Sequence, residues 1–252
     1  MSRISKTEYK ENFVFKGGFL LSNIVGIKQR TTIDIDMLMK GYQLDGNSLQ
    51  MIFDSIFKAA DGALNFNVER IETIKKEDKY GGFRIIVQCR LENIQVNIPL
   101  DIATGDPVTP EPVSYEYIPT FGDDSINIYS YNVETMMAEK LETIYSRALA
   151  NSRSKDFYDV FMIYNLHADL LELNKVRAAC KHTFRYRNTE LDYQKMLVLL
   201  EKLKLDVEQE RRWRNFTKKN VYAQDISFET VFDNCLAFVD RLMDDSHTEN
   251  DN

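Results

Sequence analysis

The sequence predicts an α+β fold in which a half built from strands and helices is followed by an all-helical half. Up to about residue 131, segments rich in β-branched and aromatic residues alternate with short helical stretches. Beyond that point apolar residues recur at helical spacing. Four of the five prolines fall between positions 107 and 119, where we expect a loop that links two domains. The predicted divisions are a core domain over 1–131, a helical domain over 132–243 and a polar tail over 244–252 that we expect to be disordered.

The first half is predicted to contain, in order, a strand over 13–16, a helix over 19–25, a strand over 31–38, a helix over 47–60, strands over 65–74, 83–91 and 95–104, and a strand over 126–132. Alternation with a period of two indicates the strands, and a short Glu-Asn turn predicts an antiparallel hairpin. Asn47 is expected to cap the helix that follows it. The second half is predicted to contain helices over 133–150, 155–167, 170–182, 191–203, 206–219 and 228–243.

The composition limits the classes of function. The formal net charge is -7, so any nucleotide or RNA site must be a local basic patch or use a metal ion. Cys89, Cys180 and Cys235 lie far apart and form no CxxC pair, which argues against zinc and disulfides and fits a reducing cytoplasm. The N-terminus lacks the apolar core of a signal peptide, and no apolar run approaches the roughly 18 residues that span a bilayer, so we expect no membrane association.

Two aspartates in the predicted strand 31–38 raise a question about charge. Residues two apart in a strand face the same way, so Asp34 and Asp36 are expected side by side, opposite Ile33 and Ile35. Neighbouring carboxylates repel each other unless a cation lies between them, and ligands that are all oxygen favour Mg²⁺ or Mn²⁺. The alternative is a solvated edge strand.

Two further features strengthen the metal interpretation. Gly17 and Gly18 lie between a strand and a helix N-terminus, where free backbone N–H groups suit a phosphate, although a plain tight turn would have the same sequence. Asp101 ends an otherwise apolar strand, where it could share the metal or merely cap the following turn. Together, the three features form an ordered set that is more specific than any one of them.

Four blocks occur in order: Lys16-Gly17-Gly18; Arg30 with Thr32, Asp34 and Asp36; Leu100-Asp101-Ile102; and Glu139-Lys140-Leu141 with Arg147 and Lys155-Asp156-Phe157-Tyr158-Asp159. In this order the chain resembles the AbiEii/AbiGii toxin family of nucleotidyltransferases, within the DNA polymerase β-like nucleotidyltransferase superfamily. The matching region runs over about 13–164. The resemblance implies a minimal nucleotidyltransferase fold, a mixed sheet flanked by helices, with a helical C-terminal part.

The resemblance also implies an activity and partners. It implies NTP-dependent transfer of a nucleotide by the toxin of a type IV-like toxin–antitoxin or abortive-infection pair, with a cognate antitoxin and possible tRNA acceptors. The implied metal ligands are Asp34, Asp36 and Asp101, and the implied nucleotide-binding residues are Lys16, Gly17, Gly18, Arg30, Thr32, Lys140 and Arg147. One departure is that the superfamily's Gly-Ser is Gly-Gly here.

The predicted helix 133–150 places Lys140 and Arg147 on one side. Helix physics alone favours a solvated basic edge, whereas the resemblance implies that Lys140 grips the NTP triphosphate. Asp156 and Asp159 lie one turn apart on the next helix, and the resemblance implies that at least one matters for activity, by orienting Lys140 or the helix junction.

Two basic segments with interleaved aromatic residues, 181–188 and 211–219, could contact RNA and stack a base. The favoured alternative is a solvated helix face with Trp213 and Phe216 turned to the core.

The resulting hypothesis is metal-assisted nucleotidyl transfer, with Asp101 accepting the proton of the attacking hydroxyl. One alternative is a non-catalytic binding protein on a nucleotidyltransferase scaffold, and another is a DxD glycosyltransferase, which would not explain the glycine turn. The choice of NTP and of acceptor cannot be read from these residues.

Overall fold

The computed structural model describes residues 1–244 apart from positions 27, 29, 31, 33, 43, 59–62, 75–80, 120–123, 167, 169 and 170. The chain divides into two compact units. The first contains Met1–Ile24, Thr31–Asp106 and Glu111–Tyr131, and the second contains Val25–Arg30, Pro107–Pro110 and Asn132–Asn252. The chain therefore passes between the units several times, and each unit is described by itself below.

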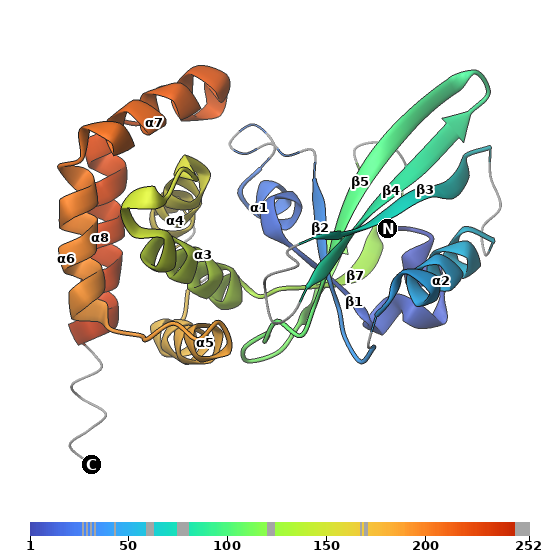
Figure 1. The fold of residues 1–252 in the computed structure, drawn as a ribbon, viewed down its shortest axis with the longest axis horizontal. Coiled ribbons are helices and arrows are strands. Elements are labelled where there is room, and N and C mark those ends of the chain that lie inside the picture. The colour runs from blue at the N-terminus through green and yellow to red at the C-terminus, as the bar shows by residue number, and fades with distance from the viewer. Residues whose placement is uncertain are drawn as a thin grey trace, which may run out of the picture. The chain divides into compact units, whose positions relative to one another are not determined.

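The first unit is a seven-stranded mixed sheet with helices (Figure 1). Its elements are η1 (Ile4–Lys6), η2 (Glu8–Glu11), β1 (Phe13–Lys16), α1 (Gly17–Val25), β2 (Ile35–Met39), α2 (Gly46–Lys58), β3 (Asn65–Ile74), β4 (Gly82–Leu91), β5 (Ile94–Thr104), β6 (Val113–Tyr117) and β7 (Ile126–Ser130). The strand order is β3-β4-β5-β2-β1-β7-β6, with β1–β7 and β2–β5 parallel and the other pairs antiparallel. The predicted mixed sheet is thus confirmed.

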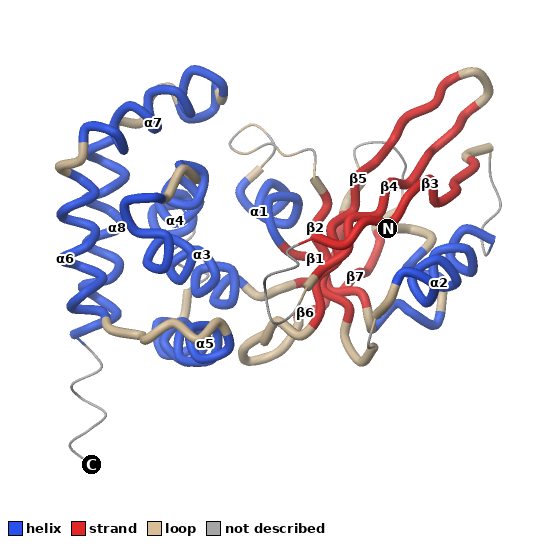
Figure 2. The backbone as a smooth tube through the Cα atoms, in the orientation of Figure 1, coloured by secondary structure: helices blue, strands red, loops and turns tan. Residues whose placement is uncertain are grey.

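Several predicted elements of this unit are present with shifted ends. The hairpin of β4 and β5 is antiparallel, as predicted, and turns at Glu92 and Asn93 (Figure 2). The helix expected over 19–25 begins two residues earlier, at the glycines. The strand expected over 31–38 begins only at Ile35, so Asp34 precedes β2 and is exposed; Ile33 lies outside the described residues.

The proline-rich segment contains a strand that the sequence did not predict. β6 lies between Pro112 and Pro119 and pairs with β7 along its whole length. The prediction of a linker is therefore wrong for residues 113–117. An edge strand tolerates flanking prolines because it needs backbone partners on only one side.

One face of the sheet is an apolar core covered by α2. The buried residues of α2 are at positions 49, 52, 53 and 56. This spacing puts them on one face of the helix. They pack with alternate residues of the strands: Phe13, Phe15, Met37, Met39, Ile85, Val87, Leu100 and Ile102. Because side chains alternate along a strand, Lys16, Asp36 and Asp101 must project from the opposite face.

The second unit consists of helices in its described part from Asn132 onward (Figure 1). They are α3 (Val133–Arg147), η3 (Ala148–Ala150), α4 (Ser154–Leu166), α5 (Leu173–Tyr186), α6 (Tyr193–Lys204), α7 (Val207–Lys219), η5 (Val221–Ala223) and α8 (Phe228–Asp244). α3 begins after Asn132, whose side-chain oxygen accepts a hydrogen bond from the Thr135 amide at 2.7 Å. Stacked Phe157 and Phe232, with ring centroids 4.7 Å apart, join α4 to α8.

Among the described residues, no helix combines the length and the hydropathy that a membrane span requires.

Candidate active site

The end of β1 places a glycine directly against a carboxylate. Gly17 has a φ of +69°, which L-residues with a side chain rarely adopt. A Cβ at this position would lie 2.1 Å from Oδ2 of Asp36. Glycine is therefore needed here both for the backbone conformation and for space. Because position 17 has no side chain, α1 can start beside the Asp36 carboxylate.

A row of charged residues crosses four adjacent strands of the sheet. In the strand register Lys16 of β1 lies opposite Asp36 of β2, Asp36 opposite Asp101 of β5, and Asp101 opposite Arg84 of β4. Directly paired residues project from the same face with Cβ atoms roughly 5 Å apart. The row thus consists of two neighbouring carboxylates with a cation at each end, and we call it the charged row.

Arg84 binds Asp101 through both carboxylate oxygens. Its Nε donates to Oδ1 and its NH2 group to Oδ2, each at 2.7 Å. The hydrogen bond and charge of Asp101, with smaller contributions from Asp34 and Glu72, raise the pKa of Arg84. Asp34 thus acts on the same end of the charged row although it lies outside β2.

The other end of the charged row is held by groups that the sequence did not single out. The Lys16 amine donates to Oδ2 of Asp106 at 2.6 Å and to the hydroxyl of Tyr131 at 3.1 Å. It also lies 4.9 Å from the centroid of the Tyr131 ring. Asp106 follows Gly105, whose φ of +84° turns the chain after β5. The available signal for Asp106 in the sequence is a Gly-Asp pair at a strand end, which is also typical of an ordinary turn.

The carboxylates of the charged row have the donor type and the excess negative charge of a divalent-metal site. Asp36 and Asp101 are in-register neighbours with only oxygen donors, and with Asp34 and Asp106 they outnumber the cations Lys16 and Arg84 by two charges. The donor chemistry and charge therefore fit Mg²⁺ or Mn²⁺. The predicted cage is not assembled, however: the described residues contain no group of three His, Cys, Asp or Glu side chains close enough to hold a metal. Both oxygens of Asp101 are engaged by Arg84 instead.

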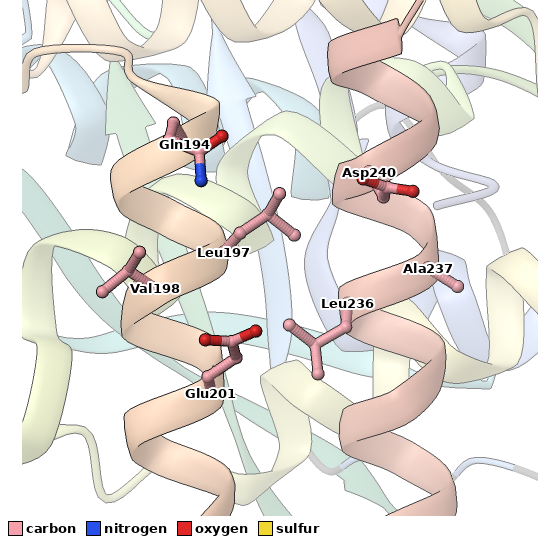
Figure 3. A pocket seen from close by; sticks show the side chains of 7 residues that line it. All are labelled: Gln194, Leu197, Val198, Glu201, Leu236, Ala237 and Asp240. Carbon is pink, nitrogen blue, oxygen red and sulfur yellow. The ribbon is translucent and has the colours of Figure 1, made fainter.

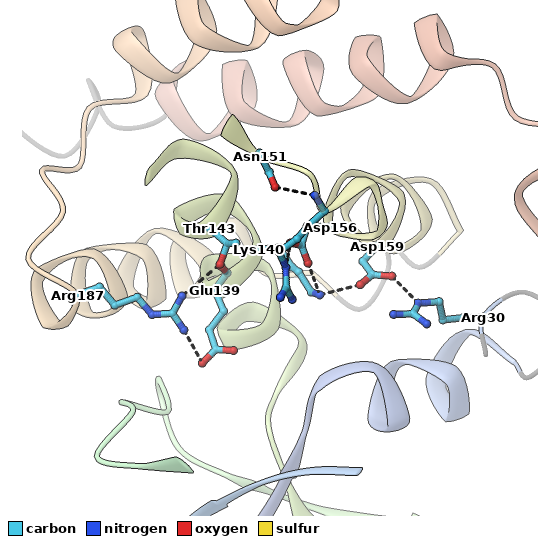
Figure 4. A network of polar contacts seen from close by, with 9 residues as sticks. Arg30, Glu139, Lys140, Thr143, Asn151, Asp156, Asp159 and Arg187 are labelled. Carbon is cyan, nitrogen blue, oxygen red and sulfur yellow. Dashed lines mark hydrogen bonds and ion pairs between the residues drawn. The ribbon is translucent and has the colours of Figure 1, made fainter. Parts of the chain in front are cut away.

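The predicted residues of the helical part form a buried ion network inside the second unit (Figure 4). The Lys140 amine lies 2.8 Å from Oδ1 of Asp156 and 2.7 Å from Oδ2 of Asp159. Arg30 binds Oδ1 of Asp159 at 2.8 Å, and Arg153 binds Oδ2 of Asp156 at 2.7 Å. The Asp156 and Asp159 side chains are 1% and 0% exposed. Both aspartates thus contact Lys140, and the importance of at least one of them for activity stays a prediction.

The charges of this network depend on one another. Burial lowers the pKa of Lys140, but Asp159 and Asp156 outweigh it, so the pKa is raised and Lys140 stays a cation. Burial raises the pKa of Asp156, but Lys140 and Arg153 outweigh it, so the pKa is lowered. A buried side chain stays charged only with such partners, because burying an unpaired ion costs on the order of several kcal/mol.

The other predicted nucleotide-binding residues lie in different surroundings. Arg147 is the last residue of α3 and is exposed, whereas Lys140, two turns earlier on the same side of the helix, is bound in the buried ion network. The nucleotide-binding role of Arg147 stays a prediction. Arg30 is bound to Asp159. Thr32 is half-buried, and Gly18 is buried in the first turn of α1.

Each of the two basic segments has a residue that contacts the rest of the second unit. Trp213 is 3% exposed, and its indole N–H donates to the carbonyl of Ile226, which confirms the predicted orientation of this ring toward the core; Phe216 is half-buried. Arg187 binds Glu142 at 2.8 Å. It also binds Glu139 at 3.2 Å (Figure 4). The second unit also has a shallow pocket of about 290 Å³ between α6 and α8, lined by Leu197, Leu236 and Glu201 among others (Figure 3). It contains none of the predicted site residues.

The fold is similar to two solved structures. One is that of JHP933 from Helicobacter pylori, with a TM-score of 0.51 and 15% sequence identity, covering 99% of this chain and 91% of that chain. The other is a Helicobacter pylori protein whose name suggests a nucleotidyltransferase, with a TM-score of 0.51 and 14% identity, covering 98% of this chain and 91% of that chain. At such low identity the likeness shows the fold alone. None of the curated proteins matches the sequence.

A family model gives the stronger evidence. The model described as "Nucleotidyl transferase AbiEii toxin, Type IV TA system" matches residues 1–234, which include the whole charged row and the Lys140 network. The chain therefore belongs to the AbiEii family of nucleotidyltransferase toxins.

Proposed function

We propose that this nucleotidyltransferase transfers NMP from an NTP to an acceptor hydroxyl at the charged row, with a divalent cation held by Asp34, Asp36 and Asp101. The observation that carries the proposal is the in-register pairing of Asp36 with Asp101 beside Gly17. The acceptor oxygen forms a bond to the α-phosphorus while the bond to the pyrophosphate oxygen breaks, and the hydroxyl proton must leave. A bound Mg²⁺ or Mn²⁺ would supply charge neutralisation and acidify the hydroxyl.

The residues of the chain have distinct tasks in this proposal. Asp101 takes the hydroxyl proton on a carboxylate oxygen. The backbone N–H groups at Gly17 and Gly18, at the start of the nine-residue helix α1, bind phosphate oxygens. Lys16, fixed by Asp106 and Tyr131, adds positive charge next to Asp36.

The second unit enters the proposal through the buried ion network. We propose that Asp156 and Asp159 hold Lys140 as a cation for the nucleotide phosphates, since both contact its amine. Roles of Arg30, Thr32 and Arg147 in nucleotide binding rest on the family resemblance. So do a tRNA 3′ end as the acceptor, a cognate antitoxin as the partner, and the cytoplasm as the location.

The test is a transfer assay with each labelled NTP and total cellular RNA. We expect Asp36→Asn and Asp101→Asn each to lower the transfer rate by at least about 100-fold, because each removes a charged group of the reacting centre. Glu116→Gln is the matched control, since it neutralises an exposed carboxylate on β6 of the same sheet. Transfer by Asp36→Asn at the wild-type rate would exclude the proposed centre.

The identity of the labelled product gives the acceptor. If the acceptor is the 3′ end, tRNA whose terminal diol has been oxidised with periodate before the assay should no longer accept label. Label in protein or in a small molecule would contradict the tRNA proposal and leave the transfer chemistry standing.

A further inference from the structure

The two cations of the charged row are held very differently. The Lys16 side chain is 12% exposed and is bound by Asp106 and Tyr131 in addition to its place opposite Asp36. The Arg84 side chain is 41% exposed, and its hydrogen bonds given above both go to Asp101. A half-exposed arginine can leave its partner for water at little cost, whereas a buried lysine with two partners cannot.

We propose that Arg84 is a displaceable counter-cation, which occupies Asp101 until a divalent cation takes its place. This inference rests on the proposed function, in which Asp101 is a metal ligand. Arg84 is a positioning residue here, because it acts through Asp101. The sheet can then fold without metal, since Arg84 offsets the repulsion between Asp36 and Asp101.

The geometry gives Arg84 a direct influence on metal binding. A divalent ion at Asp101 would meet a guanidinium whose nitrogens lie 2.7 Å from both carboxylate oxygens. The guanidinium both blocks ligand positions and repels the incoming charge. A cation that binds Asp101 therefore occupies the carboxylate that holds the arginine.

The test is Mn²⁺ binding by the full-length chain without nucleotide, measured by electron paramagnetic resonance. We expect Arg84→Gln to bind Mn²⁺ about two- to fivefold more tightly than wild type, the value of one exposed ion pair expressed as affinity. Arg84→Lys keeps the charge without the two-point contact and should lie between them. Adding Asp101→Asn to Arg84→Gln should abolish the gain.

Arg90→Gln is the matched control. It removes an arginine of the same strand and face, six residues away, which binds Gln88 and Gln95 instead of a carboxylate. Its Mn²⁺ affinity should equal that of wild type. In thermal melts without metal, Arg84→Gln should have a lower Tm than wild type, and saturating Mn²⁺ should raise it by more than it raises wild type.

A measurement on the unmodified protein guards against a folding defect in the variant. The Arg84 side-chain Nε–H signal, assigned by its loss in Arg84→Lys, should shift in NMR spectra as Mg²⁺ is added. A signal that stays unchanged at saturating Mg²⁺, or an Arg84→Gln variant that binds Mn²⁺ no more tightly than wild type, overturns the inference. If Asp36→Asn still loses transfer in that case, the proposed function stands. Wild-type transfer by Asp36→Asn overturns both.

Discussion

At position 17 the backbone and a neighbouring carboxylate both exclude a side chain. We expect Gly17→Ala to cost about 1–2 kcal/mol from its positive φ alone, and more from the displacement of Asp36. Transfer should fall by at least tenfold, because the carboxylate must move out of the charged row. The measurements are urea unfolding and the transfer assay.

Gly46→Ala provides a close comparison for Gly17→Ala. Gly46 is also the first residue of a helix, but a Cβ there would meet nothing within 4 Å. Its substitution should leave stability within about 0.5 kcal/mol of wild type, as is usual for surface changes. Equal effects at the two positions would show that the contact with Asp36 has no importance.

Asp156 gives the second unit a defined dependence on acid. Its pKa is lowered in the folded protein, so the folded state is more stable when Asp156 is ionised than when it is protonated. The stabilisation is present above its unfolded pKa of about 4 and is lost as the pH falls through the lower folded value. Between pH 6 and 3, the free energy of unfolding should fall more steeply for wild type than for Asp156→Asn, measured by urea titration at each pH. Parallel pH profiles would contradict an ionised Asp156 in the Lys140 network.

At the scale of elements, the start of α3 depends on one side chain. Asn132 accepts a hydrogen bond from the Thr135 amide, which otherwise lacks a helical partner. We expect Asn132→Ala to lower the free energy of unfolding by about 1 kcal/mol, whereas Asn132→Ser, which retains a capping oxygen, should lower it by less. Fluorescence of Trp213, the single tryptophan, reports the transition. A serine variant as unstable as the alanine variant would contradict the capping role.

Local patterns predicted the elements whose character is local. The β4–β5 hairpin has alternating residues and a two-residue turn, and the helices from α3 onward have regular apolar spacing, so both could be read from the sequence. β6 was missed because Pro110, Pro112 and Pro119 dominate its surroundings, and only pairing with β7 makes it a strand. Strand pairing depends on residues distant in the chain.

The candidate site shows the same division. The sequence identified Asp36 and Asp101 as residues that need a partner, but it could not show that they lie opposite each other, because β2 and β5 pair across three intervening elements. Arg84 gave no signal, since an arginine in an alternating strand is ordinary. Lys140, Asp156 and Asp159 could be named from the resemblance, whereas their mutual contacts and their shared burial with Arg30 required the fold. Their roles in activity stay predictions.

At the scale of the whole molecule, the chain leaves the sheet unit between α1 and β2 and returns immediately before the candidate site. The segment Val25–Arg30 belongs to the second unit, where Arg30 binds the fully buried Asp159. Only a few residues separate that anchor from Asp34 and Asp36. We therefore expect the Arg30–Asp159 ion pair to influence, through the covalent chain, the segment that leads to Asp34 and into β2.

This dependence predicts an effect of Arg30→Met on both units. Removing one partner of a buried pair should cost about 3–5 kcal/mol, which Trp213 fluorescence would detect in the second unit. Hydrogen exchange should also become faster for the amides of β2, since the segment that leads into it has lost its anchor. Arg153→Met is the control. Arg153 binds Asp156, which lies only three residues further along the chain, and the Arg153 side chain is 40% exposed. That variant should weaken the second unit and leave β2 exchange at the wild-type rate, because the Arg153 contact is local. Unchanged β2 exchange in Arg30→Met would show that the sheet holds the carboxylates independently of the helical unit.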